Sequence, residues 1–166
     1  MADSFIKFER IARAANRFAY AEVATTYIEH PFDHRNIHPS LPKSVRKLFD
    51  DGHYAQSTFE AFKFVDREVA RLAECSESGF KLMMKAFAET SPMLKLTLCN
   101  TNSEKDEQKG FQFLFAGSIL AIRNPRGHEH SVNDSPDECL DYLALASTLL
   151  RRIETAGFAL NGLTSG

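Results

Sequence analysis

The stretch of sequence that decides the fold is residues 111–130, which read FQFLFAGSILAIRNPRGHEH. Phe111, Phe115 and Ile119 recur at four-residue spacing, the period of one face of an α-helix. Arg123 continues this apolar row, so we expect its guanidinium to point toward packed side chains, where it is costly unless paired. Pro125 disfavours helical geometry at the residue before it and therefore predicts a helix end at about Arg123.

The polar end of the stretch is the candidate site. Gly127 leaves the backbone before His128 with few steric restrictions, so we expect a short turn that returns the histidine to Arg123. Arg126 is expected to be solvated, as a further contact for a phosphate. Glu60 is the nearest carboxylate that the sequence offers as a partner for Arg123.

Working outward, the rest of the chain shows the same helical periodicity. Apolar residues at three- and four-residue steps predict helices in this order: 3–28, 42–51, 54–72, 79–89, 104–123 and 136–155. Between them, residues 93–99 alternate apolar and other side chains, which predicts a short strand or extended arm. Helices joined by short links predict an all-α antiparallel bundle with an additional N-terminal helix.

Length and composition narrow the class of protein. A chain of 166 residues fits one main domain, with 43% hydrophobic and 25% charged residues. The net charge of −2 argues against a general nucleic-acid coat protein but leaves room for a local basic site. Three widely spaced cysteines, with no secretory signal and no membrane-length apolar run, predict a cytoplasmic protein without a membrane partner.

Four ordered blocks of the sequence carry a resemblance to a known family. They are residues 38–63, HPSLPKSVRKLFDDGHYAQSTFEAFK; residues 79–87, GFKLMMKAF; residues 106–130, DEQKGFQFLFAGSILAIRNPRGHEH; and residues 142–154, YLALASTLLRRIE. Together they resemble the Ymh-type proteins of the HEPN superfamily, whose motif is an arginine, a polar neighbour and a following histidine. The resemblance implies a HEPN-like helical domain over 37–158, after an N-terminal helical extension over 1–36 and before a flexible tail over 159–166.

The same resemblance implies a function and assigns roles. It implies a metal-independent endoribonuclease, a toxin or anti-phage (abortive-infection) effector, that leaves a 2′,3′-cyclic phosphate. Arg123 and His128 match the motif arginine and histidine, and Asn124 matches its polar neighbour. HEPN domains pair, so a composite site at a homodimer interface is expected. The implied partners are RNA, either single-stranded or in tRNA loops, and a cognate inhibitor or defence-system protein.

Several alternatives stay open at this point. His130 could be a second acid–base group, half of a metal pair with His128, or a plain loop histidine. His30, His34 and His38 share a four-residue spacing, but the prolines among them disfavour one helix, so no metal or cofactor site is predicted. The alternative function is a non-catalytic HEPN dimer that binds a protein or nucleotide and regulates another enzyme.

Overall fold

A computed structural model describes residues 29–129 and 131–161 of the chain, and its described elements are all helices. In chain order they are α2 (Pro31–His34), α3 (Lys43–Asp50), α4 (Tyr54–Leu72), α5 (Gly79–Ala86), α6 (Asn102–Ser118), the π-helical turn η1 (Ile119–Arg123), α7 (Asn124–His128) and α8 (Pro136–Thr155). The predicted all-α class is confirmed. The helix predicted over 3–28 lies outside the described residues.

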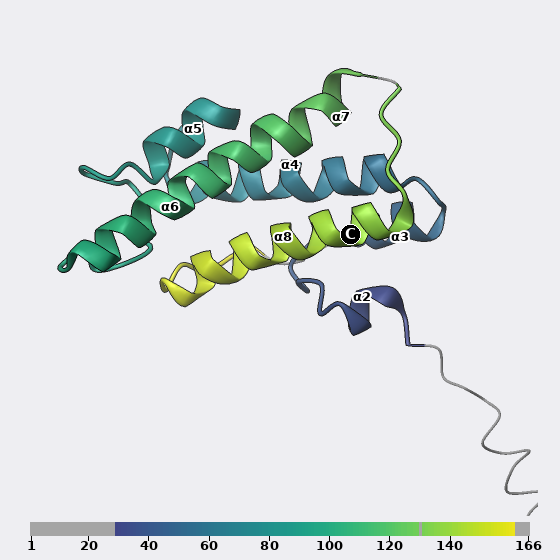
Figure 1. Cartoon of the computed structure of the whole chain (residues 1–166), viewed down its shortest axis with the longest axis horizontal. Helices are drawn as coiled ribbons and strands as arrows, with labels where there is room; N and C mark the ends of the chain where they lie inside the picture. The colour runs from purple at the N-terminus through teal and green to yellow at the C-terminus, as the bar shows by residue number, and fades with distance from the viewer. Residues whose placement is uncertain (1–28, 130, 162–166) are drawn as a thin grey trace, which may run out of the picture. The chain divides into compact units, whose positions relative to one another are not determined.

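Helix α4 is the centre of the compact unit that begins at Pro31. It contacts α3, α5, η1, α7 and α8, and in Figure 1 it lies between the long green helix of α6 and α8. Its apolar row supplies Phe62, Val65 and Val69, which have no exposed surface. Each such side chain contributes about 1.5–3 kcal/mol on burial, so this row stabilises the arrangement of the neighbouring helices.

The ends of the helices follow from local sequence. Ser135 caps α8 and Glu138 bonds back to it, which is the reciprocal capping box expected from Ser-Pro-Asp-Glu. Gly52 follows α3 with φ of +79°, a backbone conformation that glycine adopts without strain. The capping box fixes where α8 begins, and Gly52 favours the end of α3.

Residues 93–99 form no strand, contrary to one expectation from their alternation. Leu94 and Leu96 are buried, as the alternation requires, but Leu98 is 75% exposed. The buried Gln108 of α6 takes the place of a neighbouring strand. Its Oε1 accepts from the backbone N–H of Leu96 at 2.8 Å, and its Nε2 donates to the carbonyl of Leu94 at 3.1 Å. A side chain therefore satisfies backbone groups that a strand would have paired with another strand.

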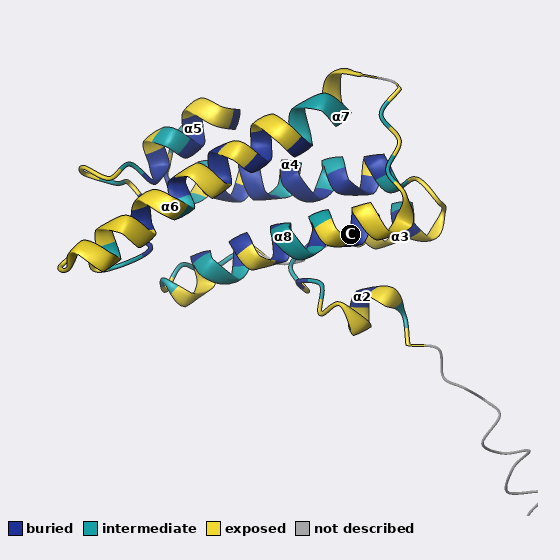
Figure 2. Ribbon diagram, viewed as in Figure 1, coloured by how far each residue is buried: buried dark blue, intermediate teal, exposed yellow. Residues whose placement is uncertain are grey.

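The first and last described residues of the compact unit lie close to segments that contact its core. In α2, Phe32 is buried and lies 5.2 Å from Phe49, measured between ring centroids. After α8, the backbone N–H of Asn161 donates to Glu68 on α4 at 2.9 Å. Figure 2 shows buried residues along the inner faces of α4 and α8, and exposed residues along much of α6. No helix in the described ranges combines the length and apolar character needed to cross a bilayer.

Candidate functional site

The helix that carries Arg123 does not end there, and this corrects the expected turn. It passes through the π-helical turn η1 and continues as α7 to His128. In the turn, the N–H of Asn124 donates to the carbonyl of Ile119, five residues earlier. Pro125 then falls in the first turn of α7, where a missing N–H costs little. The wider turn thus accommodates the proline without breaking the helix. Single π-helical turns inside α-helices are frequent at functional sites.

Arg123 is half-buried and only partly satisfied by the protein. Its Nη1 donates to Oδ1 of Asn124 at 3.1 Å, and its Nη2 lies 4.0 Å from a carboxylate oxygen of Asp66. The guanidinium carbon lies 5.8 Å from the centre of the Phe59 ring. Nε is buried and has no hydrogen-bond partner within the described part of the chain. An arginine has five N–H donors, so this one keeps donors available for an anion.

His128 completes a small pocket with Arg123. The pocket holds about 80 Å³ and is lined by Phe59, Arg123, Asn124, Gly127 and His128. His128 is exposed, so its imidazole can exchange protons with solvent or a ligand. Small-molecule sites usually measure roughly 300–1,000 Å³, so this pocket suits one group, such as a phosphate, rather than a whole nucleotide.

Gly127 lets α7 approach α4 closely. A Cβ at this position would lie 2.7 Å from Cε2 of Phe59, closer than side-chain atoms normally pack. The ring of Phe59 also lies beside Arg123 and the ammonium of Lys63, so a shift of the ring would change these two contacts. The absence of a side chain at Gly127 therefore sets the width of the pocket.

We expect Gly127→Ala to lower the free energy of unfolding by about 1–3 kcal/mol, since it overpacks this contact. The matched control is Gly110→Ala on α6, where a Cβ meets nothing within 4 Å. There the better helix propensity of alanine should raise stability by up to about 1 kcal/mol. Urea unfolding of the two variants measures both effects, and equal stabilities would contradict the close contact.

Asp66, not Glu60, is the carboxylate nearest Arg123. Glu60 forms an ion pair with Lys63, with 2.6 Å between Nζ and Oε1. Asp66 is 5% exposed and its other oxygen accepts from the backbone N–H of Gly79 at 2.7 Å, at the start of α5. The sequence held one clue to Asp66, because it falls on the apolar row of α4, four residues after Phe62.

Arg126 is buried, although the sequence predicted a solvated side chain. Only 7% of its side chain is exposed, and it forms an ion pair with Asp134, of which 3% is exposed. Burial lowers the pKa of Arg126, but its hydrogen bond and charge interaction with Asp134 outweigh this and raise the pKa above its ordinary value. Arg126 is therefore fully engaged within the protein, whereas Arg123 is not.

No other histidine of the described residues lines this pocket. His130 is outside the described residues. His38 is 4% exposed, and its Nε2 lies 3.0 Å from a carboxylate oxygen of Glu154 on α8. No cluster of three or more metal-ligating side chains occurs in the described part of the chain.

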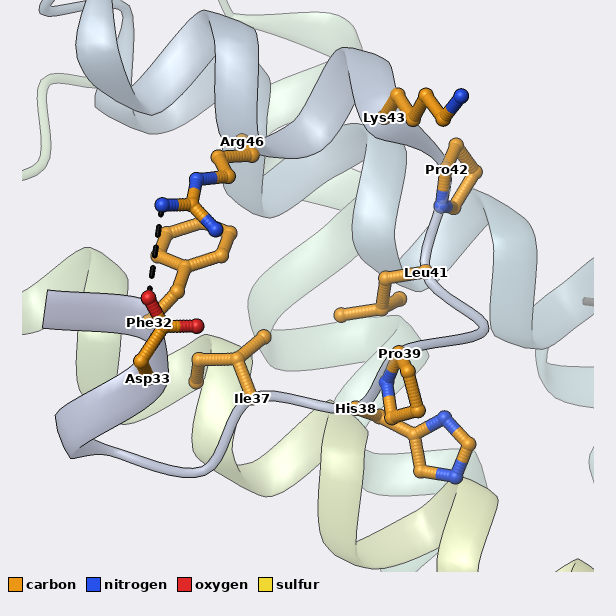
Figure 3. Close-up of a pocket in the computed structure, with 9 residues that line it drawn as sticks. All are labelled: Phe32, Asp33, Ile37, His38, Pro39, Leu41, Pro42, Lys43 and Arg46. Atoms are coloured by element: carbon orange, nitrogen blue, oxygen red, sulfur yellow. Dashed lines mark ion pairs between the residues drawn. The ribbon is translucent and has the colours of Figure 1, made fainter. Parts of the chain in front are cut away.

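A second, larger pocket of about 250 Å³ lies around α2 and the start of α3 (Figure 3). Its Arg46 is already engaged, 3.6 Å from Asp33 and 5.9 Å from the centre of the Phe32 ring. Its histidine, His38, is bonded to Glu154. The pocket of Arg123 and His128 is therefore the better candidate for acid–base chemistry.

Comparison with known proteins adds one finding. A family model described as "Protein of unknown function (Hypoth_ymh)" matches residues 35–153, well over half of the chain. This range contains every described residue of the pocket. No curated protein and no solved structure matches the chain.

Proposed function

We propose that this chain, which belongs to the Hypoth_ymh family, is a metal-independent endoribonuclease of HEPN type that acts in the cytoplasm as a homodimer. The observation that carries the proposal is the contrast between two neighbouring arginines. Each of the three nitrogens of Arg126 donates to a protein partner, whereas Nη1 is the one nitrogen of Arg123 with a hydrogen-bond partner in the described part of the chain, and Arg123 lines a phosphate-sized pocket beside an exposed histidine. An arginine held in this way suits an anion that comes from outside the chain.

In the proposed reaction, His128 acts as an acid–base group on RNA. A base removes the proton from the ribose 2′-hydroxyl, and the 2′-oxygen attacks the adjacent phosphorus. The bond from phosphorus to the 5′-oxygen breaks, and an acid returns a proton to that oxygen. The products are a 2′,3′-cyclic phosphate and a 5′-hydroxyl. Arg123 stabilises the charge that grows on the phosphorane oxygens, and Asn124 orients Arg123 through the hydrogen bond at Oδ1.

An exposed apolar face next to the pocket supports the proposed homodimer. We define the α6 face as Phe113, Leu114, Gly117 and Leu120, which recur at helical spacing and are all exposed. Phe113, Leu114 and Leu120 are 55%, 50% and 48% exposed. Contiguous apolar residues of this kind mark interaction surfaces, and Gly117 permits close approach of a second helix. Ala116 is buried within the same chain and cannot contribute to the interface.

The α6 face also leads to the catalytic groups. Asn124 follows Leu120 by four residues, across the π-helical turn, and lines the pocket. A second copy paired along the α6 face would bring two such pockets near one another. Each chain supplies one His128, so pairing would provide both the base and the acid that the reaction needs.

We expect the purified protein to cleave RNA in excess EDTA at the rate seen without chelator. The reason is that the proposed acid–base and charge-stabilising groups are all side chains of the protein. The measurement is gel analysis of labelled tRNA and single-stranded RNA, with the product ends identified as 2′,3′-cyclic phosphate and 5′-hydroxyl. Loss of cleavage in EDTA, with recovery on adding zinc or manganese, would refute the metal-independent mechanism.

A non-catalytic regulatory dimer is the second candidate function. It is favoured by the net charge of −2 and by Glu60, which neutralises the Lys63 ammonium beside the pocket. Growth of cells that express the protein separates the two candidates. If the protein is a toxin with nuclease activity, expression of the wild type should stop growth, and expression of His128→Ala should not. A regulatory dimer should give the same growth with both.

A further inference from the structure

Arg126 and Asp134 form a buried clamp that holds α7 and the loop after it. Nε of Arg126 donates to Oδ2 of Asp134 at 2.8 Å, and Nη2 donates to Oδ1 in a second, shorter bond. The two parallel bonds match the fork of a guanidinium to a carboxylate, which fixes direction as well as distance. The clamp therefore joins α7 to the chain just before α8.

The clamp is also connected to three other elements. The third nitrogen of Arg126, Nη1, donates to the carbonyl of Ile122 in η1 at 2.7 Å. Thr58 of α4 donates its hydroxyl to Oδ2 of Asp134 at 2.9 Å. The ring of Tyr142 on α8 lies 4.5 Å from the guanidinium carbon of Arg126. Arg126 thus fixes α7 against η1, α4 and α8 at once.

Such an arrangement does more for geometry than for stability. The desolvation of a buried ion pair offsets most of its attraction, and apolar replacements of similar volume are often at least as stable. What the pair supplies is a fixed orientation. The segment it orients is α7, a helix of five residues whose last residue is His128. A helix this short has little stability of its own, so its position depends on such contacts.

We propose that Arg126 is a positioning residue, whose clamp with Asp134 holds His128 at the geometry with Arg123 that cleavage requires. This inference rests on the proposed ribonuclease function. Arg126 itself contacts no substrate in this scheme. It acts by keeping the imidazole within reach of the phosphate bound at Arg123, where a displacement of about 1 Å can cost on the order of 100-fold in rate.

The chain offers a matched control in Arg152 of α8. Arg152 also contacts a carboxylate, a backbone carbonyl and an aromatic ring. Its Nη2 lies 2.9 Å from Oε1 of Glu107 and donates to the carbonyl of Leu96 at 2.6 Å. Its guanidinium carbon lies 5.3 Å from the centre of the Phe111 ring. It lines no part of the Arg123 pocket. Arginine-to-lysine replacement keeps the charge at either position and removes the planar fork.

The experiment compares Arg126→Lys with Arg152→Lys on the RNA that the wild type cleaves best. We expect Arg126→Lys to lower kcat at least about 10-fold with KM unchanged, because binding at Arg123 persists while the imidazole is misplaced. Binding of the same oligonucleotide with 2′-O-methyl groups should be unaltered. Arg152→Lys should leave both constants at the wild-type values. Equal kcat for Arg126→Lys and wild type would overturn the positioning role.

Two further measurements test the proposal if Arg126→Lys does not fold or if the wild type cleaves no RNA. If Arg126→Lys fails to fold, Thr58→Val removes the hydroxyl that donates from α4 to Asp134 and that also bonds the thiol of Cys139. This variant should still lower kcat about threefold; an unchanged kcat would then count against the proposal. Hydrogen exchange of the backbone amides of Asn124 and of residues 126–129 should accelerate at least about tenfold in Arg126→Lys and not in Arg152→Lys. If the wild type cleaves no RNA, the proposed function fails, and unchanged exchange in this segment would refute the clamp separately.

Discussion

Replacing either Arg123 or His128 by alanine is expected to lower the rate of RNA cleavage at least about 100-fold. His128→Ala removes the proposed acid–base group, and Arg123→Ala removes the N–H donors that would stabilise the negative charge on the phosphorane oxygens. His128 acts mainly in the transition state, so its loss should lower kcat with little change in KM, whereas Arg123 also binds the phosphate before reaction, so its loss should lower kcat and raise KM. Initial rates on a labelled RNA substrate measure the effect.

The control for the first prediction is His53→Ala, at the start of α4. His53 is exposed like His128, but its side chain makes no capping hydrogen bond and it lines no part of the pocket. Its removal should change the cleavage rate less than twofold. Thermal unfolding of His128→Ala should match the wild type, because an exposed side chain adds little stability. Wild-type cleavage by His128→Ala would exclude the proposed site.

The helices that position the site could be predicted from the sequence because their boundaries are set locally. The bounds predicted for α4, 54–72, are those observed, since Gly52 stops α3 and the apolar row defines the rest. The start of α8 follows from its capping box. Local chemistry of this kind is contained in a few neighbouring residues, so no knowledge of the tertiary fold is required.

The partners of the charged residues could not be predicted, because each pair joins two different elements of the fold. Arg126 and Asp134 are eight residues apart and pair across a loop, while Arg123 and Asp66 lie on different helices. A charge in a sequence is usually solvated, which made Arg126 a poor candidate for burial. Its burial depends on Thr58 and Tyr142, which only the fold brings to it.

The expected turn after Arg123 failed for a different reason. Pro125 disfavours αR geometry at the residue before it, yet Asn124 adopts that geometry, with φ of −64° and ψ of −44°. Here η1 shifts to bonds between residues five apart, and Pro125 begins a new helical turn. The sequence contains no marker for that shift. The consequence is that Arg123 and His128 lie along one continuous helix instead of across a loop.

Replacement of Leu120 on the α6 face is the second change that we expect to have a large effect on RNA cleavage. If two copies pair along this face, Leu120→Glu places two like charges in an apolar contact, where unpaired ions are costly. Leu120 is 48% exposed in the single chain, so the change should leave the fold of each copy intact. We expect a monomer by light scattering coupled to size exclusion. Because one chain supplies only one His128, we also expect cleavage to fall at least about 100-fold.

The control is Leu98→Glu, which adds the same charge at a side chain that is 75% exposed and belongs to the 93–99 segment. It should leave both the dimer and the cleavage rate unchanged. A further arm mixes two inactive chains, Arg123→Ala and His128→Ala, with different tags. A mixed dimer keeps one arginine and one histidine on opposite chains, so any recovery above the two single variants would show that the roles are divided between the chains; it should stay far below the wild type, because one of the two imidazoles is missing. Leu120→Glu in one of them should abolish that recovery, because the chains no longer pair. A monomeric Leu120→Glu protein with full activity would show that each pocket works alone, and would remove the composite site from the mechanism.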